Sequence, residues 1–364
     1  MPANIAHMVI AHKALERLKS KEGNEVANFA NMIDGASDGN NCRAYMNLGS
    51  IGPDLYYYGS IAGSLKDMLT EGFVQAIGVT PWSYHLHSNQ PNIYPLKLGE
   101  ILFKDVIRKN DKPTLQDDDL RKLAYIAGHL THIAADQIIH PVVNFIAKPY
   151  YRSGENRRKH RECEVFQDYF LYEEIYRDKR ESLRGRQKAK YDFFKQDFNK
   201  WVDCVPGFTT KNTEEWFRYF LQRGFAETYG TFPEERIMEN SVDNLLLTLK
   251  TCKKLGPYKN AAEDYEKNGP DSKMYKEYIK DVDYVKFYEE AVKLAVIYII
   301  ALYEIYTVLK RGKDFTEKPH KERFRNIVSD EDLSCPLKQK ICDKAYAALI
   351  SKKDTKTKCK KLFA

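Results

Sequence analysis

The chain has 364 residues, of which 43% are hydrophobic and 30% are charged. This composition excludes a predominantly disordered chain, because it supplies enough apolar surface for a sizeable core. The net charge of +7 at pH 7 favours anionic partners such as phosphate esters or acidic membrane surfaces, without selecting one function.

Apolar residues recur at helical spacing along almost the whole chain, and no alternating strand pattern of useful length occurs, so we predict an all-α fold. The predicted helices cover residues 5–18, 25–32, 96–109, 118–140, 158–176, 191–202, 213–229, 240–255, 275–279 and 284–309. The predicted connections cover residues 34–41, 49–63, 80–95 and 141–159. We predict a core domain at residues 1–205 and a helical C-terminal part packed on it at residues 206–364.

The first residues, the cysteines and the last residues of the chain bear on where the protein is located. The first residues lack a basic stretch followed by an apolar segment, so we recognise no secretory signal. Seven scattered cysteines without a CxxC pair favour a reducing, cytoplasmic location, with an exported form as the alternative. Six lysines lie within the last thirteen residues. This Lys-rich tail is either a solvated terminus or a contact for an anionic membrane, where each lysine adds about 1 kcal/mol.

Histidine is distributed unevenly along the chain. Eight of the nine histidines lie at or before His160, and only His320 lies beyond it. Neutral imidazoles are common metal ligands, so this distribution predicts a metal site in the first half of the chain.

The densest group of candidate ligands lies in the segment GHLTHIAADQIIHP, residues 128–141. On an α-helix at about 100° per residue, His132, Asp136 and His140 fall within about 80° of one another and project from one face. Such nitrogen and carboxylate donors suit zinc. His132 and His140 lie about 12 Å apart along the axis, so they would serve different ions, with Asp136 between them as a bridge. The alternative is a hydrogen-bond network without metal.

Other candidate ligands flank this helix in the sequence. His160 and Glu164 are one turn apart, a spacing that is also common on solvated helices. His7 and His12 are about 140° apart on a regular helix, and both reach one ion if the helix starts after His7. Asp54 follows Gly-Pro, where the alternative to a ligand is a structural Asx-turn.

These segments resemble the zinc-dependent phospholipase C family, which shares its fold with the S1/P1 nucleases. They are also similar to the catalytic domain of glycosylphosphatidylinositol-specific phospholipase D. In family order, the matching segments are HMVIAHKAL at 7–15, GSIGPD at 49–54, GHLTHIAADQIIHP at 128–141 and HRECE at 160–164. The resemblance implies an all-α, multi-helix bundle that holds three zinc ions at the bottom of a cleft, here with a helical C-terminal extension.

The resemblance also implies a ligand set. The first ion would take Asp54, a loop histidine, His132 and Asp136. The second ion would take His140, His160 and Glu164. The third ion would take His12, Asp136 and a third ligand. Many family members complete that third set with an N-terminal tryptophan, which this chain lacks, and we predict that His7 replaces it. For the loop histidine we prefer His87 and keep His85 as the alternative. His129 has no family counterpart, so we expect it to support a ligand or to pack between helices.

The resemblance implies phosphodiester hydrolysis, and we predict a phospholipase C that cleaves the glycerol–phosphate bond of phospholipids. Two zinc ions sharing Asp136 would hold a hydroxide at neutral pH, since zinc lowers the pKa of water from about 15.7 towards about 7. Asp54 would orient or deprotonate that water.

Two other functions remain open at this point. One is an S1/P1-type single-strand nuclease or nucleotidase, with the run Tyr56–Tyr58 stacking on bases. Nucleic acid is the less favoured substrate, because the N-terminal tryptophan and paired cysteines are missing. The other is a non-catalytic, zinc-stabilised module that binds lipid or protein.

Overall fold

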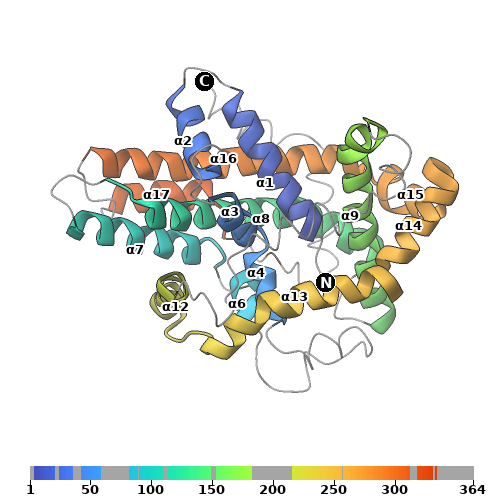
Figure 1. The fold of residues 1–364 in the computed structure, drawn as a ribbon, viewed down its shortest axis with the longest axis horizontal. Helices are drawn as coiled ribbons and strands as arrows, with labels where there is room; N and C mark the ends of the chain where they lie inside the picture. The colour runs from blue at the N-terminus through green and yellow to red at the C-terminus, as the bar shows by residue number, and fades with distance from the viewer. Residues whose placement is uncertain are drawn as a thin grey trace.

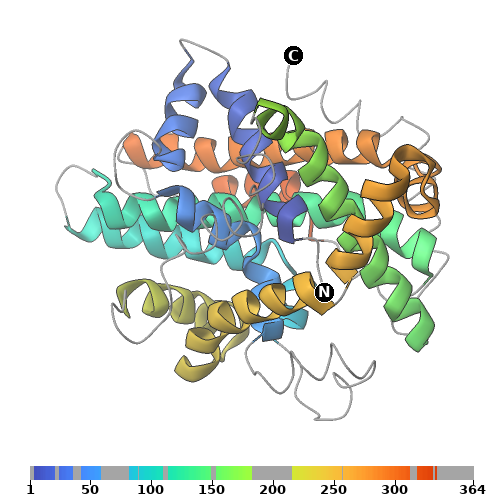
Figure 2. The ribbon, with the colours of Figure 1, turned by 45° about the vertical axis from the view of Figure 1, so that its right-hand side comes forward.

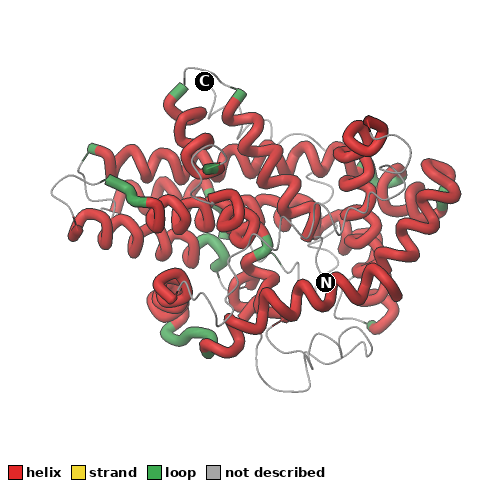
Figure 3. The backbone as a smooth tube through the Cα atoms, in the orientation of Figure 1, coloured by secondary structure: helices red, strands yellow, loops and turns green. Residues whose placement is uncertain are grey.

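The computed structural model describes residues 4–20, 24–35, 42–58, 82–88, 90–109, 114–148, 153–182, 215–255, 257–311, 318–330 and 333. Every regular element within these residues is helical, which confirms the all-α prediction and is visible in Figure 3. The α-helices are α1 (Asn4–Lys19), α2 (Glu25–Asp34), α3 (Cys42–Ser50), α4 (Gly52–Leu55), α6 (Trp82–Ser88), α7 (Ile93–Lys109), α8 (Asp117–Ala147), α9 (Gly154–Ser182), α12 (Glu215–Tyr229), α13 (Glu235–Leu255), α14 (Pro257–Asn268), α15 (Lys273–Tyr275), α16 (Tyr284–Lys310) and α17 (Lys318–Ile327). Shorter segments are η1 (Tyr56–Tyr58), η5 (Gly269–Asp271) and the π-helical η6 (Lys276–Lys280).

The long helix α8 is the centre of the fold. It packs mainly against α3 and α16, and α1 packs against both α16 and α9. Figures 1 and 2 show α8 and α16 running side by side in both views. Helices from the second half of the chain thus cover those of the first half, with α12 on α7, α14 on α9 and α16 on α8.

Two glycines let α3 and α8 approach until their backbones touch. A Cβ atom on Gly49 would lie 2.1 Å from the carbonyl oxygen of Tyr125, and one on Gly128 would lie 2.1 Å from that of Met46. Any larger residue would therefore force the two helices apart. This close approach brings the end of α3 beside the metal-ligand candidates of α8.

The predicted connection at 141–159 is wrong in its first part, which belongs to α8, and in its last part, where α9 already begins at Gly154. Pro141 cannot donate a backbone hydrogen bond, which favours a helix end at this point. Instead α8 continues through Pro141 to Ala147, because Val142, Val143 and Ala147 are buried in the core. Tertiary packing outweighs the local cost of the proline in the helix. The connection between α8 and α9 is therefore shorter than predicted.

The predicted loop at 80–95 is also wrong. It contains α6 and the start of α7, with Pro95 in the first turn of α7, where proline is tolerated. Helices α3, α4, α14 and α17 were not predicted, and α4 lies in the predicted connection at 49–63. The predicted helix at 191–202 and the Lys-rich tail lie outside the described residues.

The apolar segment at 294–303 lies inside α16, within the helix predicted at 284–309. By length and composition alone, α16 is the one helix of the described chain that would reach across a membrane. Ala291, Ala295 and Ile299 are fully buried, and the helix packs against α8 and α1. Its apolar character is accounted for by this packing in the core.

Candidate metal centre

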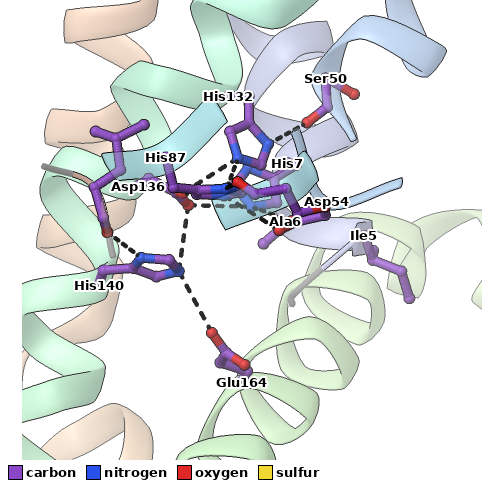
Figure 4. Close-up of polar contacts among 12 residues, drawn as sticks. Ile5, Ala6, His7, Ser50, Asp54, His87, His132, Asp136, His140 and Glu164 are labelled. Carbon is purple, nitrogen blue, oxygen red and sulfur yellow. Dashed lines mark hydrogen bonds and ion pairs between the residues drawn. The ribbon is translucent and has the colours of Figure 1, made fainter. Parts of the chain in front are cut away.

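The face of α8 that carries His132, Asp136 and His140 meets side chains from four other helices (Figure 4). His7 comes from α1, Asp54 from α4, His87 from α6, and His160 with Glu164 from α9. Segments distant in the sequence therefore meet one face of the central helix α8. Helical periodicity had indicated that His132, Asp136 and His140 share this face.

Asp136 lies at the middle of this group and is buried, with 2% of its surface exposed. Four imidazole nitrogens surround its carboxylate. Its Oδ1 lies 3.3 Å from Nε2 of His7 and 3.4 Å from Nε2 of His140, and its Oδ2 lies 3.1 Å from Nε2 of His132 and 3.3 Å from Nε2 of His87. A carboxylate with two imidazoles on each oxygen has the geometry of a bridge between cations.

Main-chain carbonyls fix the orientation of two of these rings. The Nδ1 of His132 lies 2.8 Å from the Ser50 oxygen, and the Nδ1 of His87 lies 2.6 Å from the Ser83 oxygen. A carbonyl only accepts, so each Nδ1 carries the proton and each Nε2 of a neutral ring has a lone pair. These two Nε2 atoms lie 3.1 Å apart. Two lone pairs at this distance repel each other unless a cation or an added proton lies between them.

Asp54 adds a second carboxylate to the same group. It lies in the first turn of α4 with Pro53 before it, so the predicted turn is a short helix. Its Oδ1 is 3.2 Å from Nε2 of His87, and its Oδ2 is 3.7 Å from Nε2 of His7. The carboxylate is buried, with 3% of the residue exposed. Burial of two carboxylates in one place is costly unless positive charge is supplied.

A separate group lies at the other end of this face of α8. Nε2 of His160 is 3.0 Å from Oε1 of Glu164, and Nε2 of His140 is 3.6 Å from the same oxygen. The remaining nitrogen of His140, Nδ1, donates to the carbonyl of Leu333 at 2.6 Å. His140 is thus turned so that its Nε2 faces both Glu164 and Asp136.

The structure separates His7 from His12. Helix α1 begins at Asn4, because the buried carboxylate of Asp168 accepts hydrogen bonds from the backbone nitrogens of Ile5 and Ala6 (3.2 and 2.8 Å). His7 therefore lies inside the helix, and the condition for both histidines to reach one ion is not met. His7 stacks on His132, with ring centroids 4.1 Å apart, whereas a ring nitrogen of His12 lies 2.7 Å from Oδ1 of Asn47.

The structure also separates His85 from His87. Two residues apart on a helix, their side chains project about 200° from each other. The ring of His85 packs against Trp82 and Tyr229, away from the carboxylates. His129 is fully buried between Tyr94 and Tyr125, so it packs between helices and joins neither group.

The charges of the site follow from burial and from the facing partners. Burial, reinforced by the ring of His132, lowers the pKa of His7 to about 3 and keeps this ring neutral. Burial opposes ionisation of Asp136, but His140 and His132 outweigh it and hold its pKa well below the usual value. Burial opposes the charged form of His87, yet the facing Asp136 and Asp54 raise its pKa well above the usual value. The site favours ionised carboxylates and a cation beside them.

These residues fit zinc in number, chemistry and spacing. Three groups of potential ligands form among the described residues, each with its ligand atoms within 4.8 Å of one another: His7, His132 and Asp136; Asp54, His87 and His132; and His140, His160 and Glu164. Ligand atoms at about 2.0–2.2 Å from a tetrahedral zinc lie about 3.3 Å apart. The separations of 3.0–3.7 Å around Asp136, Asp54 and Glu164 agree with this value.

The sequence could not indicate the partners that orient the rings. The carbonyls of Ser50, Ser83 and Leu333 act through the main chain, which every residue possesses. Asp168, which caps α1, had a signal in retrospect: it lies one helical turn after Glu164 and continues the stripe of α9.

Comparison with known families agrees with this geometry. The family model for zinc dependent phospholipase C matches residues 6–207, more than half of the chain. The chain therefore belongs to the zinc-dependent phospholipase C family. No curated protein sequence and no solved structure gives a significant match to it. The matched segment contains every proposed ligand and ends before α12.

Proposed function

We propose that the protein is a zinc-dependent phospholipase C that hydrolyses the glycerol–phosphate bond of a phospholipid. The observation that carries this proposal is the buried Asp136 with four imidazoles on its two oxygens, in a chain of this family. The ligands that we assign to three zinc ions are His7, Asp54, His87, His132, Asp136, His140, His160 and Glu164.

Each side chain has a task that follows from its contacts. Bound zinc would supply Lewis-acid chemistry, lowering the pKa of water and neutralising charge on phosphoryl oxygens. His87 and His132 keep their Nε2 lone pairs for the cation, because their Nδ1 protons are held by backbone carbonyls. Asp136 holds two imidazole rings beside each of its two carboxylate oxygens.

We assign Asp54 to orienting the attacking water. Burial alone would raise its pKa, but His132 and His87 hold the pKa below the usual value, so Asp54 accepts a hydrogen bond and is a weak base. The water oxygen then attacks phosphorus and releases a proton, the bond from phosphorus to the glycerol oxygen breaks, and that oxygen takes up a proton to give diacylglycerol and a phosphomonoester.

Two observations count against the alternative functions. Tyr56 and Tyr58 are buried in the core at 5% and 1% exposure, so neither ring offers a surface for base stacking. A structural zinc site needs one closed ion, whereas three ligand groups converge here.

The decisive experiment compares three substrates with the zinc-loaded, full-length chain: a phosphatidylcholine emulsion, a phosphoinositide and single-stranded DNA. We expect release of diacylglycerol from lipid, and a loss of at least about 100-fold in Asp136→Asn. Asp119→Asn is the matched control, because Asp119 is an equally buried carboxylate on α8 that accepts from the backbone of Gln116. Cleavage of DNA alone would favour the nuclease, and no cleavage by a fully zinc-loaded chain would favour the binding module.

A further inference from the structure

The segment that follows α17 is tied to the helices that carry the metal centre. The carbonyl of Val328 accepts from Nδ2 of Asn92 at 2.8 Å, and the backbone nitrogen of Ser329 donates to the hydroxyl of Tyr298 at 3.3 Å. That hydroxyl in turn donates to Oε1 of Gln137, the residue after Asp136, at 2.5 Å. The segment is therefore anchored on the residue before α7 and on α16, whose Tyr298 in turn contacts α8.

Leu333 carries the connection into the site itself. Its backbone nitrogen donates to the carbonyl of His87 at 2.9 Å, and its carbonyl accepts from Nδ1 of His140 at 2.6 Å. Its side chain is buried, with 2% of the residue exposed. One residue thus holds the end of α6 and the last histidine of the α8 stripe.

The contact with His140 determines which nitrogen of that ring faces the site. With Nδ1 protonated and bound to Leu333, Nε2 has its lone pair directed towards Oδ1 of Asp136 (3.4 Å) and Oε1 of Glu164 (3.6 Å). Ser50 and Ser83 do the same for His132 and His87. Those two carbonyls lie within the family match at 6–207, whereas Leu333 lies far beyond its end.

We propose that Leu333 is a positioning residue of the metal centre, and that Val328, Ser329 and Leu333 together are a required part of that centre. This inference rests on the proposed function, because it takes His140 as a zinc ligand. Loss of a hydrogen-bond partner behind a ligating histidine typically weakens metal binding by about 10- to 100-fold. The loss should affect the ion held by His140, His160 and Glu164, and leave the other ions bound.

The test uses the full-length chain and three variants. Leu333→Ala removes the buried side chain that seats the segment, Leu333→Met conserves it, and Leu309→Ala is the matched control at an equally buried leucine at the end of α16. Zinc affinities are measured by competition with a chromophoric chelator, and melting temperatures are measured in parallel. We expect one ion to bind about 10- to 100-fold more weakly in Leu333→Ala only, with recovery in Leu333→Met.

A second readout does not depend on metal. Long-range proton–nitrogen NMR of the histidine rings in the zinc-free chain should show the Nδ1-protonated form of His140 in the wild type and a mixture of forms in Leu333→Ala. If Leu333→Ala does not fold, Tyr298→Phe, which removes the acceptor for Ser329, should weaken the same ion by less.

The outcomes separate this inference from the proposed function. A wild-type chain that binds no zinc would overturn both. A wild type with its full zinc content, whose affinity is unchanged in Leu333→Ala or equally weakened in Leu309→Ala, would overturn this inference alone.

Discussion

The Nε2 atoms of His87 and His132 face each other at 3.1 Å, while both Nδ1 atoms are bound to backbone carbonyls. When both rings are neutral, the lone pairs of the two Nε2 atoms face each other, next to the two buried carboxylates of Asp54 and Asp136. Only a cation, or protonation of a ring, relieves the repulsion. The folded chain is therefore built around positive charge, which either a bound cation or a proton on His87 supplies.

Removal of metal should accordingly destabilise the protein. At free zinc about 1,000 times its dissociation constant, each independent site adds about 4.1 kcal/mol to the free energy of unfolding. We expect a chelator to lower the melting temperature in calorimetry, and zinc, but not magnesium, to restore it, because imidazole suits zinc. Elemental analysis of protein refolded in excess zinc should find three ions per chain. One ion or none would contradict the multinuclear centre.

A second prediction concerns the contact between α3 and α8. In Gly128→Ala the new Cβ would lie 2.1 Å from the carbonyl oxygen of Met46, so α3 must move and draw the Ser50 carbonyl away from His132. We expect a loss of about 3 kcal/mol in the free energy of unfolding, measured with urea, together with a lower zinc content.

Gly99→Ala is the matched control for this substitution. Gly99 is a helical glycine of α7 with nothing within 4 Å of the position of a Cβ. Replacement by alanine should stabilise the chain by about 0.5–1 kcal/mol. Equal effects of the two substitutions would mean that helix propensity, and not the helix contact, governs Gly128.

Local periodicity explains which parts of the site the sequence could predict. His132, Asp136 and His140 share a stripe because helix geometry fixes their spacing, and His160 with Glu164 follows the same rule. Helix α6 escaped prediction because prolines at both sides of it indicate a loop, although proline is compatible with a helix start.

Long-range contacts explain the rest. The capping of α1 by Asp168 places His7 inside a helix, and this contact joins residues 162 or more positions apart. The bond from His140 to Leu333 spans 193 positions and uses a main-chain atom. The contact with Leu333 leaves no pattern in a single sequence, and the sequence likewise did not show that the ring of His12 meets Asn47.

Substitution of the two N-terminal histidines gives a third prediction. We expect His7→Ala to lose one zinc per chain, because Nε2 of His7 faces Asp136 and Asp54. His12→Ala should keep the zinc content, because the His12 ring is bound to Asn47 instead. Elemental analysis after gel filtration measures both. Zinc loss in His12→Ala with full content in His7→Ala would reverse the assignment.

The fourth prediction concerns acid stability away from the metal centre. Asp34 is the last residue of α2 and is buried at 1% exposure. Its carboxylate accepts from Nε and Nη2 of Arg43 at 2.8 and 2.7 Å and also pairs with Lys19, so it joins α1, α2 and α3. Burial alone would raise the pKa of Asp34, but the hydrogen bonds from Arg43 and Lys19 outweigh it and lower the pKa below the usual value.

A lowered pKa in the folded state stabilises the fold above the unfolded-state pKa of about 3.9, and this stabilisation is lost as the pH falls through the folded-state pKa. Asp34→Asn removes the charge that Arg43 and Lys19 bind and should cost about 1.5–3 kcal/mol at pH 7. The difference between wild type and Asp34→Asn in urea unfolding should stay constant from pH 7 to about pH 5 and shrink below about pH 4. Both proteins are compared without zinc, so that protonation of the metal ligands affects them equally. A difference that persists undiminished at pH 3.5 would show that the shape of the side chain, and not its charge, joins the three helices.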